Sequence, residues 1–211
     1  SEHAVITGTV GAAGENVKMT GTGDFQTSPK LGSMHLSMNV TGKTFDMDEV
    51  LQGWTIYMKS PVFSAQLPAG KSWVSLDLQK AGQKLGLDFN KFTQQDPSDM
   101  LGALKKAGSL QKLGSETIDG VDTTHYHVTI DLAKAPNGPQ LMKLTNLKSL
   151  PADVWIDGQD QLRRMKESYS VTTGGQTIST SMQMDLSNYG EQVNVQVPSS
   201  SETLDMTKLG G

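Results

Sequence analysis

Residues 33–40 read SMHLSMNV, and polar and apolar side chains alternate through the whole stretch. Successive side chains of a β-strand point to opposite faces of its sheet. The alternation therefore predicts a strand with one face toward a core and the other toward solvent. The core-facing residues would be Met34, Leu36, Met38 and Val40.

The same period of two recurs along most of the chain. Further strand-like segments lie at 17–25, 45–47, 54–58, 74–78, 153–157, 162–171, 178–186 and 193–197. Asp119-Gly120, Asp157-Gly158 and Gly174-Gly175 are dipeptides typical of hairpin turns, so the strands are expected to be largely antiparallel in chain order. Roughly ten or eleven strands are more than a flat open sheet usually sustains, and we expect the sheet to curl. Gly21 and Gly23 inside one strand would help it bend.

Helical signals are few. Asp96 and Pro97 are typical of a helix start, and they predict a helix over 97–107. Leucines near helical spacing predict a second helix within 139–150, and residues 79–92 predict a short turn or helix. Short helices cannot cover so many strands laid flat. The sheet must close into a barrel, split into a sandwich, or curl around the helices.

Composition excludes several classes of protein. The 211 residues carry a net charge of -4 without a basic stripe, which argues against nucleic-acid binding. Cysteine is absent, so disulfides, thiolate metal sites and a cysteine nucleophile are excluded. No run of about 18 apolar residues is present to span a membrane. The length predicts a single domain over 1–198, followed by a loosely held tail at 199–211.

Methionine is used heavily in the predicted strands. The chain has 11 methionines, and those within strand segments are Met19, Met34, Met38, Met47, Met58, Met165, Met182 and Met184. The unbranched, polarizable side chain suits a surface that must fit varied apolar ligands, but it also fills an irregular core. Both interpretations stay open at this point.

Catalytic patterns are weak. No G-x-S-x-G elbow occurs, and no nucleophile, base and oxyanion donor can be grouped from the sequence. Asp46, Asp48 and Glu49 cluster as a paired-carboxylate site would, but Asp46 and Asp48 alternate with Phe45 and Met47, which is typical of a solvated strand face. We predict that the protein is not an enzyme.

Residues 118–131, IDGVDTTHYHVTID, contain the pair His125 and His127. On a strand after the Asp119-Gly120 turn, both histidines would point outward. The inward side of that strand would carry Tyr126, Val128 and Ile130. A metal site would need a third ligand, from His35 or a nearby carboxylate, and we predict neither a metal nor a cofactor.

Several longer segments carry a family resemblance. They are GWTIYMKSPVF (53–63), KSWVSLDL (71–78), QQDPSDMLGALKKAG (94–108), LGSETIDGVDTTHYHVTIDL (113–132), PADVWIDGQDQLRRM (151–165) and MDLSNYGEQVNVQVP (184–198). In this order, from about residue 5 to residue 206, they resemble the extracytoplasmic lipoproteins of actinobacteria of the LppX/LprG type, which belong to the LolA-like superfamily.

The resemblance implies a mainly β (α+β) fold. It would be a strongly curved antiparallel half-barrel with two or three helices covering its open side and an apolar cavity for lipid acyl chains. It also implies a monomer tethered by a lipidated N-terminal cysteine, missing here, at the extracytoplasmic face of the cell membrane. Helix 97–107 or the loop before it would act as a lid.

The function expected from this resemblance is the binding and shuttling of a lipid or lipidated glycoconjugate. The alternative is a non-catalytic protein-interaction or scaffold lipoprotein whose core is filled by its own side chains. Strand alternation predicts the lipid-binding residues as Met34, Leu36, Met38, Phe45, Met47, Ile56, Met58, Tyr126, Val128, Ile130, Met182 and Met184.

Overall fold

The computed structural model describes residues 1–12, 14–64, 66–88, 106, 108–135, 137–173 and 175–208. The strands are β1 (Glu2–Ala12), β2 (Glu15–Gln26), β3 (Leu31–Val40), β4 (Lys43–Gln52), β5 (Thr55–Lys59), β6 (Trp73–Asp77), β7 (Gly108–Ile118), β8 (Val121–Asp131), β9 (Ser149–Asp157), β10 (Leu162–Thr173), β11 (Gln176–Ser187) and β12 (Thr203–Asp205). The helical segments are α1 (Pro61–Ser64), α2 (Leu78–Lys84), α4 (Gly138–Thr145) and the 3-10 helix η3 (Met206–Lys208). The helix predicted over 97–107 lies, apart from residue 106, outside the described residues.

All of these strands join in one sheet with the order β12-β6-β5-β4-β3-β2-β1-β11-β10-β9-β8-β7. The neighbours are antiparallel except β12, which runs parallel to β6. The mainly β fold class is confirmed, and the described sheet has 12 strands rather than ten or eleven. Strand β12 lies in the tail that was expected to be loosely held, where Thr203–Asp205 pair with Trp73–Ser75.

Hairpin turns join most neighbouring strands. Asp119 and Gly120 have positive φ angles of 48° and 81°, as a two-residue type I′ turn requires, and they connect β7 to β8 as predicted. Gly175, with a φ of 78°, lies in the turn between β10 and β11. The turn between β9 and β10 is longer and covers residues 158–161. The Asp157 carboxylate holds it by accepting hydrogen bonds from the backbone N–H groups of Gln159 and Gln161.

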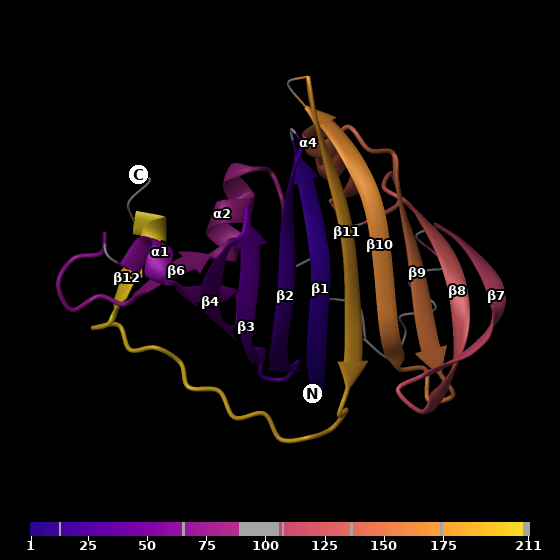
Figure 1. Ribbon diagram of the computed structural model, residues 1–211, viewed down its shortest axis with the longest axis horizontal. Coiled ribbons are helices and arrows are strands. Elements are labelled where there is room, and N and C mark those ends of the chain that lie inside the picture. The colour runs from indigo at the N-terminus through magenta and orange to yellow at the C-terminus, as the bar shows by residue number, and fades with distance from the viewer. Residues whose placement is uncertain are drawn as a thin grey trace.

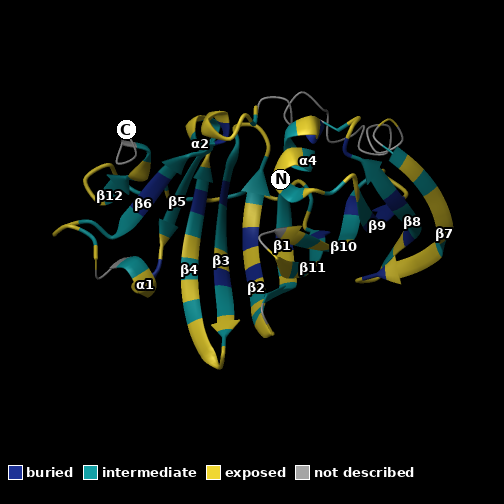
Figure 2. Ribbon diagram, turned by 90° about the horizontal axis from the view of Figure 1, so that it is seen from above, coloured by how far each residue is buried: buried dark blue, intermediate teal, exposed yellow. Residues whose placement is uncertain are grey.

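The sheet is strongly curved, and α2 and α4 lie on the same side of it (Figures 1 and 2). Glycines in β2 permit close packing on that side. A Cβ atom at Gly21 would lie 2.5 Å from Leu36 Cδ2, and one at Gly23 would collide with the backbone oxygen of Ser33. The Leu36 side chain at Gly21 and the β3 backbone at Gly23 can therefore approach β2 this closely because neither position has a Cβ atom.

The packed core lies against β1 and the strands that follow it in the sheet. Its buried members are Ala4, Val128, Val154, Ile156, Leu162 and Leu186. The apolar alternation at 193–197 does not form another strand, which corrects the sequence interpretation. That segment runs past the strand ends toward β12 (Figure 1), and it is fastened at its start because Gly190 donates its backbone N–H to the Ser1 carbonyl, at 3.0 Å.

Candidate functional site

The strand register collects the methionines on one face of the sheet, which we call the inner face. Residues in register on neighbouring strands form rows across it. Three successive rows are Met165–Met184–Ile6–Gly21–Leu36–Met47, Glu167–Met182–Gly8–Met19–Met38–Phe45, and Gly23–Met34–Glu49–Met58–Val74. These rows contain every methionine of the strand segments named from the sequence. The alternation predicted which side of each strand faces inward. The strand register shows that these inward sides join into one continuous surface.

Burial divides the predicted lipid-binding residues into two groups. Val128 is 0% exposed and belongs to the packed core, and Tyr126, Ile130 and Met184 pack against that core. Leu36 is also buried, at 8% exposure. Tyr126, Ile130 and Met184 are half-buried against the core, and the half-buried residues that are not packed against it are Met34, Met38, Phe45, Met47, Ile56, Met58 and Met182. On β2–β5, neighbouring side chains therefore do not fully cover the inner-face methionines. We call this surface the methionine face, and its members are Met19, Met34, Met38, Met47 and Met58.

A hollow of about 660 Å³ crosses five neighbouring strands, from β2 to β9. Its lining is Thr7, Gly8, Thr9, Lys18, Met19, Thr20, Pro151, Ala152, Asp153, Lys166, Glu167, Ser168, Ser181, Met182 and Gln183. Of the predicted lipid-binding residues, this lining contains Met182. The hollow has a lining of mixed polar and apolar residues, and it differs from the apolar cavity that the resemblance implies.

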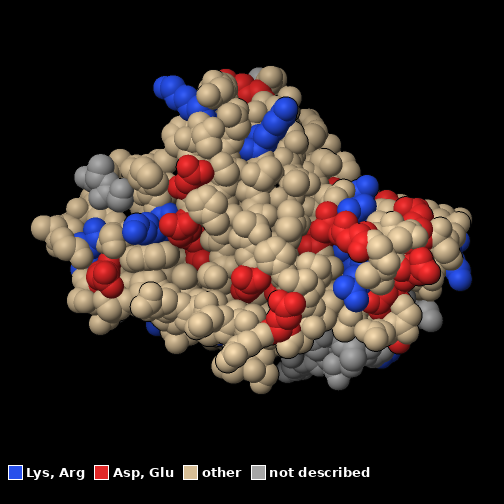
Figure 3. All heavy atoms as spheres, turned by 60° about the horizontal axis from the view of Figure 1, so that its bottom comes forward, with Lys and Arg blue, Asp and Glu red and all other residues tan. Residues whose placement is uncertain are grey.

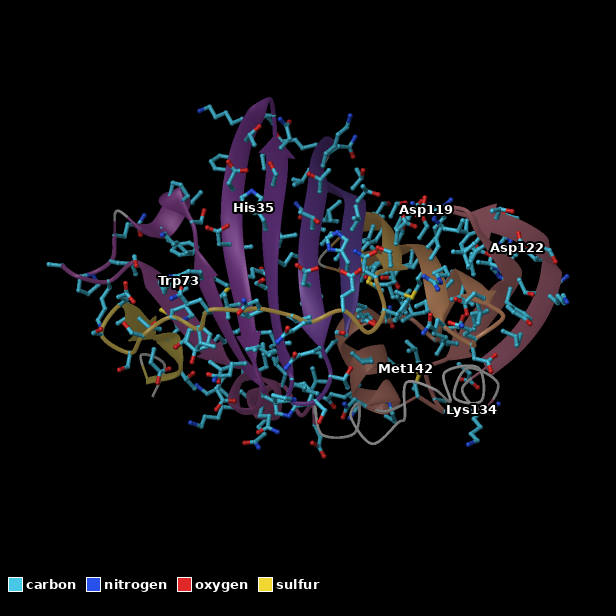
Figure 4. The ribbon with its side chains drawn as sticks, turned by 90° about the horizontal axis from the view of Figure 1, so that it is seen from below. His35, Trp73, Asp119, Asp122, Lys134 and Met142 are labelled. Carbon is cyan, nitrogen blue, oxygen red and sulfur yellow. The ribbon has the colours of Figure 1, made fainter. Side chains whose placement is uncertain are left out.

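The histidines occupy the opposite, outer face, and each lies next to a carboxylate. The Nδ1 atoms of His3 and His35 are each 2.7 Å from an oxygen of Asp24 and Asp48, respectively. His127 Nδ1 is 3.0 Å from Asp153. His35 is labelled on β3 in Figure 4. The outward direction predicted for His125 and His127 is confirmed, and the pattern is one of cross-strand pairs on a solvated face.

The outer face also contains a buried aromatic cluster that sequence reasoning missed. Trp155, only 4% exposed, stacks on His125 with 4.0 Å between ring centroids. Its Nε1–H donates to Glu116 at 3.0 Å, and the other Glu116 oxygen lies 2.9 Å from His125 Nδ1. The Trp155 hydrogen bond, followed by the His125 contact, holds the pKa of Glu116 below its usual value. The three residues come from β7, β8 and β9, so no local sequence signal could have grouped them.

Charged side chains gather around this cluster. Figure 3 shows acidic and basic residues concentrated at the β7–β9 end of the molecule, and Figure 4 places Asp119 and Asp122 at the hairpin there. Arg164 pairs with Asp185, and Arg163 with the buried Asp157 at 2.6 Å. These contacts satisfy the polar groups of the outer face with protein partners, which favours a structural role for this end.

The carboxylates that suggested a hydrolase lie on opposite faces. Asp46 and Asp48 are exposed on the outer face beside His35, whereas Glu49 is half-buried on the inner face. Across the described ranges, no group of three or more His, Cys, Asp or Glu side chains could hold a metal ion. Within the same ranges, no helix has the length and apolar character needed to cross a membrane.

Comparison with known proteins agrees with this architecture. The family model described as LppX_LprAFG lipoprotein matches residues 99–195. The crystal structure of the lipoprotein LppX from Mycobacterium tuberculosis covers 92% of this chain and 89% of its own, with 19% identity and a TM-score of 0.51. The match to the family model and the shared fold confirm the resemblance to lipoproteins of the LppX/LprG type.

Two Streptomyces proteins are also similar in sequence. An uncharacterized 31.2 kDa protein of Streptomyces griseus is 29% identical over 161 residues, which cover 67% of this chain and 52% of that protein. A Streptomyces coelicolor protein provisionally designated a lipoprotein is 26% identical over 149 residues, covering 69% of this chain and 46% of its own. The chain thus spans about half the length of the curated relatives it matches.

Proposed function

We propose that this chain, a relative of the LppX and LprAFG lipoproteins, binds the acyl chains of a lipid or lipidated glycoconjugate against its inner face and carries them at the outer side of the cytoplasmic membrane. The proposal involves no catalytic step. The partners are the acyl chains and the membrane surface, with attachment through a lipidated cysteine, a residue that these 211 residues do not contain.

The observation that carries this proposal is the methionine face. Its five methionines lie in three adjacent rows across β2–β5 and are all half-buried, so an apolar ligand laid across these strands would remove their exposed surface from water. Burying one methylene contributes about 0.8 kcal/mol. An acyl chain with about ten buried methylenes would gain on the order of 8 kcal/mol before the costs of association. Flexible methionines can follow acyl chains of different shape, which suits a carrier.

A different observation favours the scaffold alternative for part of the molecule. Tyr126, Val128, Ile130 and Met184 are packed into or against the core, so this part of the inner face is filled by the protein itself. We assign the binding of lipid to the methionine face and not to β8. If the methionine face were also self-filled in solution, the chain would be a scaffold lipoprotein.

The test begins with protein purified from its native membrane, which is extracted with organic solvent and analysed by mass spectrometry. A carrier yields a lipid in stoichiometric amount and takes up a fluorescent fatty-acid probe. Met38→Asp places a charge on the methionine face, and Asn39→Asp places the same charge on the next residue of β3, which is exposed on the outer face. We expect only Met38→Asp to abolish uptake while thermal unfolding shows that both variants fold. Repeated absence of lipid and of probe uptake in the unmodified protein would refute the carrier function.

A further inference from the structure

Two carboxylates, Glu49 and Glu167, lie within the three methionine rows of the inner face. Glu49 on β4 lies in register between Met34 on β3 and Met58 on β5. Its neighbours on the same side of β4 are Met47 and Leu51. An acidic residue in the middle of a methionine row is unexpected if the surface has only to bind hydrocarbon.

Glu167 repeats the arrangement elsewhere on the same face. It lies in register with Met182 on β11 and Ala152 on β9. Four strands, β3, β2, β1 and β11, separate β10 from β4 in the sheet, so Glu49 and Glu167 are two separate positions and not one acidic cluster.

Neither carboxylate has a hydrogen-bond or ion-pair partner among the described residues, and none of the residues in register with Glu49 in its row is basic. Both side chains are half-buried, and loss of solvation raises the pKa of each above its usual value. By contrast, two carboxylates of the outer face have protein partners: Asp48 lies beside His35, and Glu116 accepts a hydrogen bond from Trp155. Partial desolvation of a carboxylate that has no protein donor is unfavourable, and a ligand that supplies a donor reduces this cost.

From this contrast we propose that Glu49, with Glu167 as a second position, determines which lipids the inner face accepts, and that it selects lipids whose polar part offers hydroxyl or ammonium hydrogen-bond donors. The inference rests on the proposed function, since it concerns the polar group of the bound lipid. Acyl chains lie along the methionine rows, and a donor near the head of the lipid meets the carboxylate. A lipid with a free carboxylate still binds through its acyl chain, but more weakly than a lipid with a donor, because the like charge of Glu49 repels its carboxylate.

The test compares three probes with purified protein: a fluorescently labelled monoacylglycerol with two free hydroxyl groups, the labelled methyl ester of the same acyl chain, which has no donor, and cis-parinaric acid, which carries a carboxylate. The variants are Glu49→Met, which completes the methionine row, and Glu167→Met. Asp48→Asn is the matched control, because it changes the next residue of β4 on the outer face.

We expect the unmodified protein to prefer monoacylglycerol over methyl ester by about tenfold, as one charge-assisted hydrogen bond allows. Glu49→Met reduces this preference to about one, leaves ester affinity unchanged or higher, and strengthens binding of cis-parinaric acid. Asp48→Asn keeps the original preference. Glu167→Met produces a smaller change in the same direction.

Three results would contradict the proposals, and they distinguish failure of the carrier function from failure of lipid selection by Glu49 and Glu167. If no probe binds the unmodified protein, the carrier function itself fails, and the selection inference with it. If all probes bind but Glu49→Met and Glu167→Met leave their relative affinities unchanged, the selection is overturned while the carrier function stands. If Asp48→Asn alters the preference as much as Glu49→Met does, the effect is general surface charge and the inference is overturned. Thermal unfolding of each variant confirms that it is folded.

Discussion

Shortening a side chain is expected to lower stability in the packed core, and to weaken ligand uptake on the methionine face. Val128 is 0% exposed and lies in register between Leu110 and Ala152, whereas Met38 is half-buried between Met19 and Phe45. Val128→Ala removes two methyl groups from a packed site. At about 0.8 kcal/mol per group for transfer, plus a term for the cavity left behind, the cost is about 2–3 kcal/mol. Met38→Ala removes a larger side chain from a site that is already partly hydrated, and we expect a cost of about 1 kcal/mol or less.

Urea unfolding followed by far-UV circular dichroism measures both costs, and an unchanged m value shows that the same transition is compared. Uptake of a fluorescent fatty acid by the same samples completes the comparison. We expect Val128→Ala to lower stability without altering uptake, and Met38→Ala to weaken uptake with little loss of stability. If Met38→Ala costs as much as Val128→Ala or more, the methionine face is packed like a core, and the division of the inner face is wrong.

Further predictions concern pH and packing. Because the pKa of Glu116 is lowered in the folded protein, its ionised carboxylate stabilises the fold at pH values above its unfolded pKa near 4.5. This stabilisation is lost as the pH falls through the folded pKa. Glu116→Gln should therefore be less stable than the unmodified protein at pH 7, and the difference should vanish in acid. Glu49 has a raised pKa, so its charge destabilises the fold as pH rises, and Glu49→Met should be more stable at pH 7 but not below pH 4.5. Parallel melting curves from pH 3 to pH 8 check both signs, and a difference independent of pH would contradict them. Gly21→Ala places a Cβ 2.5 Å from Leu36 Cδ2 and should cost about 1–3 kcal/mol by urea unfolding; an unchanged midpoint would show that Leu36 moves freely.

Local patterns accounted for much of the fold. The alternation in 33–40 identified β3 and its inward side, because side-chain direction on a strand depends only on position along that strand. Asp119-Gly120 identified the β7–β8 hairpin, since both residues tolerate positive φ. Strand β12 was not predicted because it is only three residues long and is stabilised by its parallel pairing with β6, which no local pattern signals.

The candidate site was less predictable than the fold. The 12 residues proposed to bind lipid follow from alternation, and their role in binding stays a prediction. Alternation gives the side of a strand but not the depth of burial, so Val128 and Met38 looked equivalent in the sequence although one is enclosed and the other half-exposed. Glu49 was grouped with Asp46 and Asp48 because they are neighbours in sequence, yet a one-residue step on a strand reverses the face.

Local sequence patterns specify a curved, mainly antiparallel sheet with an inward methionine side, because the period of two and the turn dipeptides act over a few residues. The alignment of the strands with one another follows from the tertiary fold. That register places the eight strand methionines in three adjacent rows, sets Glu49 between two of them, and brings Glu116, His125 and Trp155 together from three strands. Register depends on pairings between residues far apart in the chain, and these become defined only when the whole sheet packs.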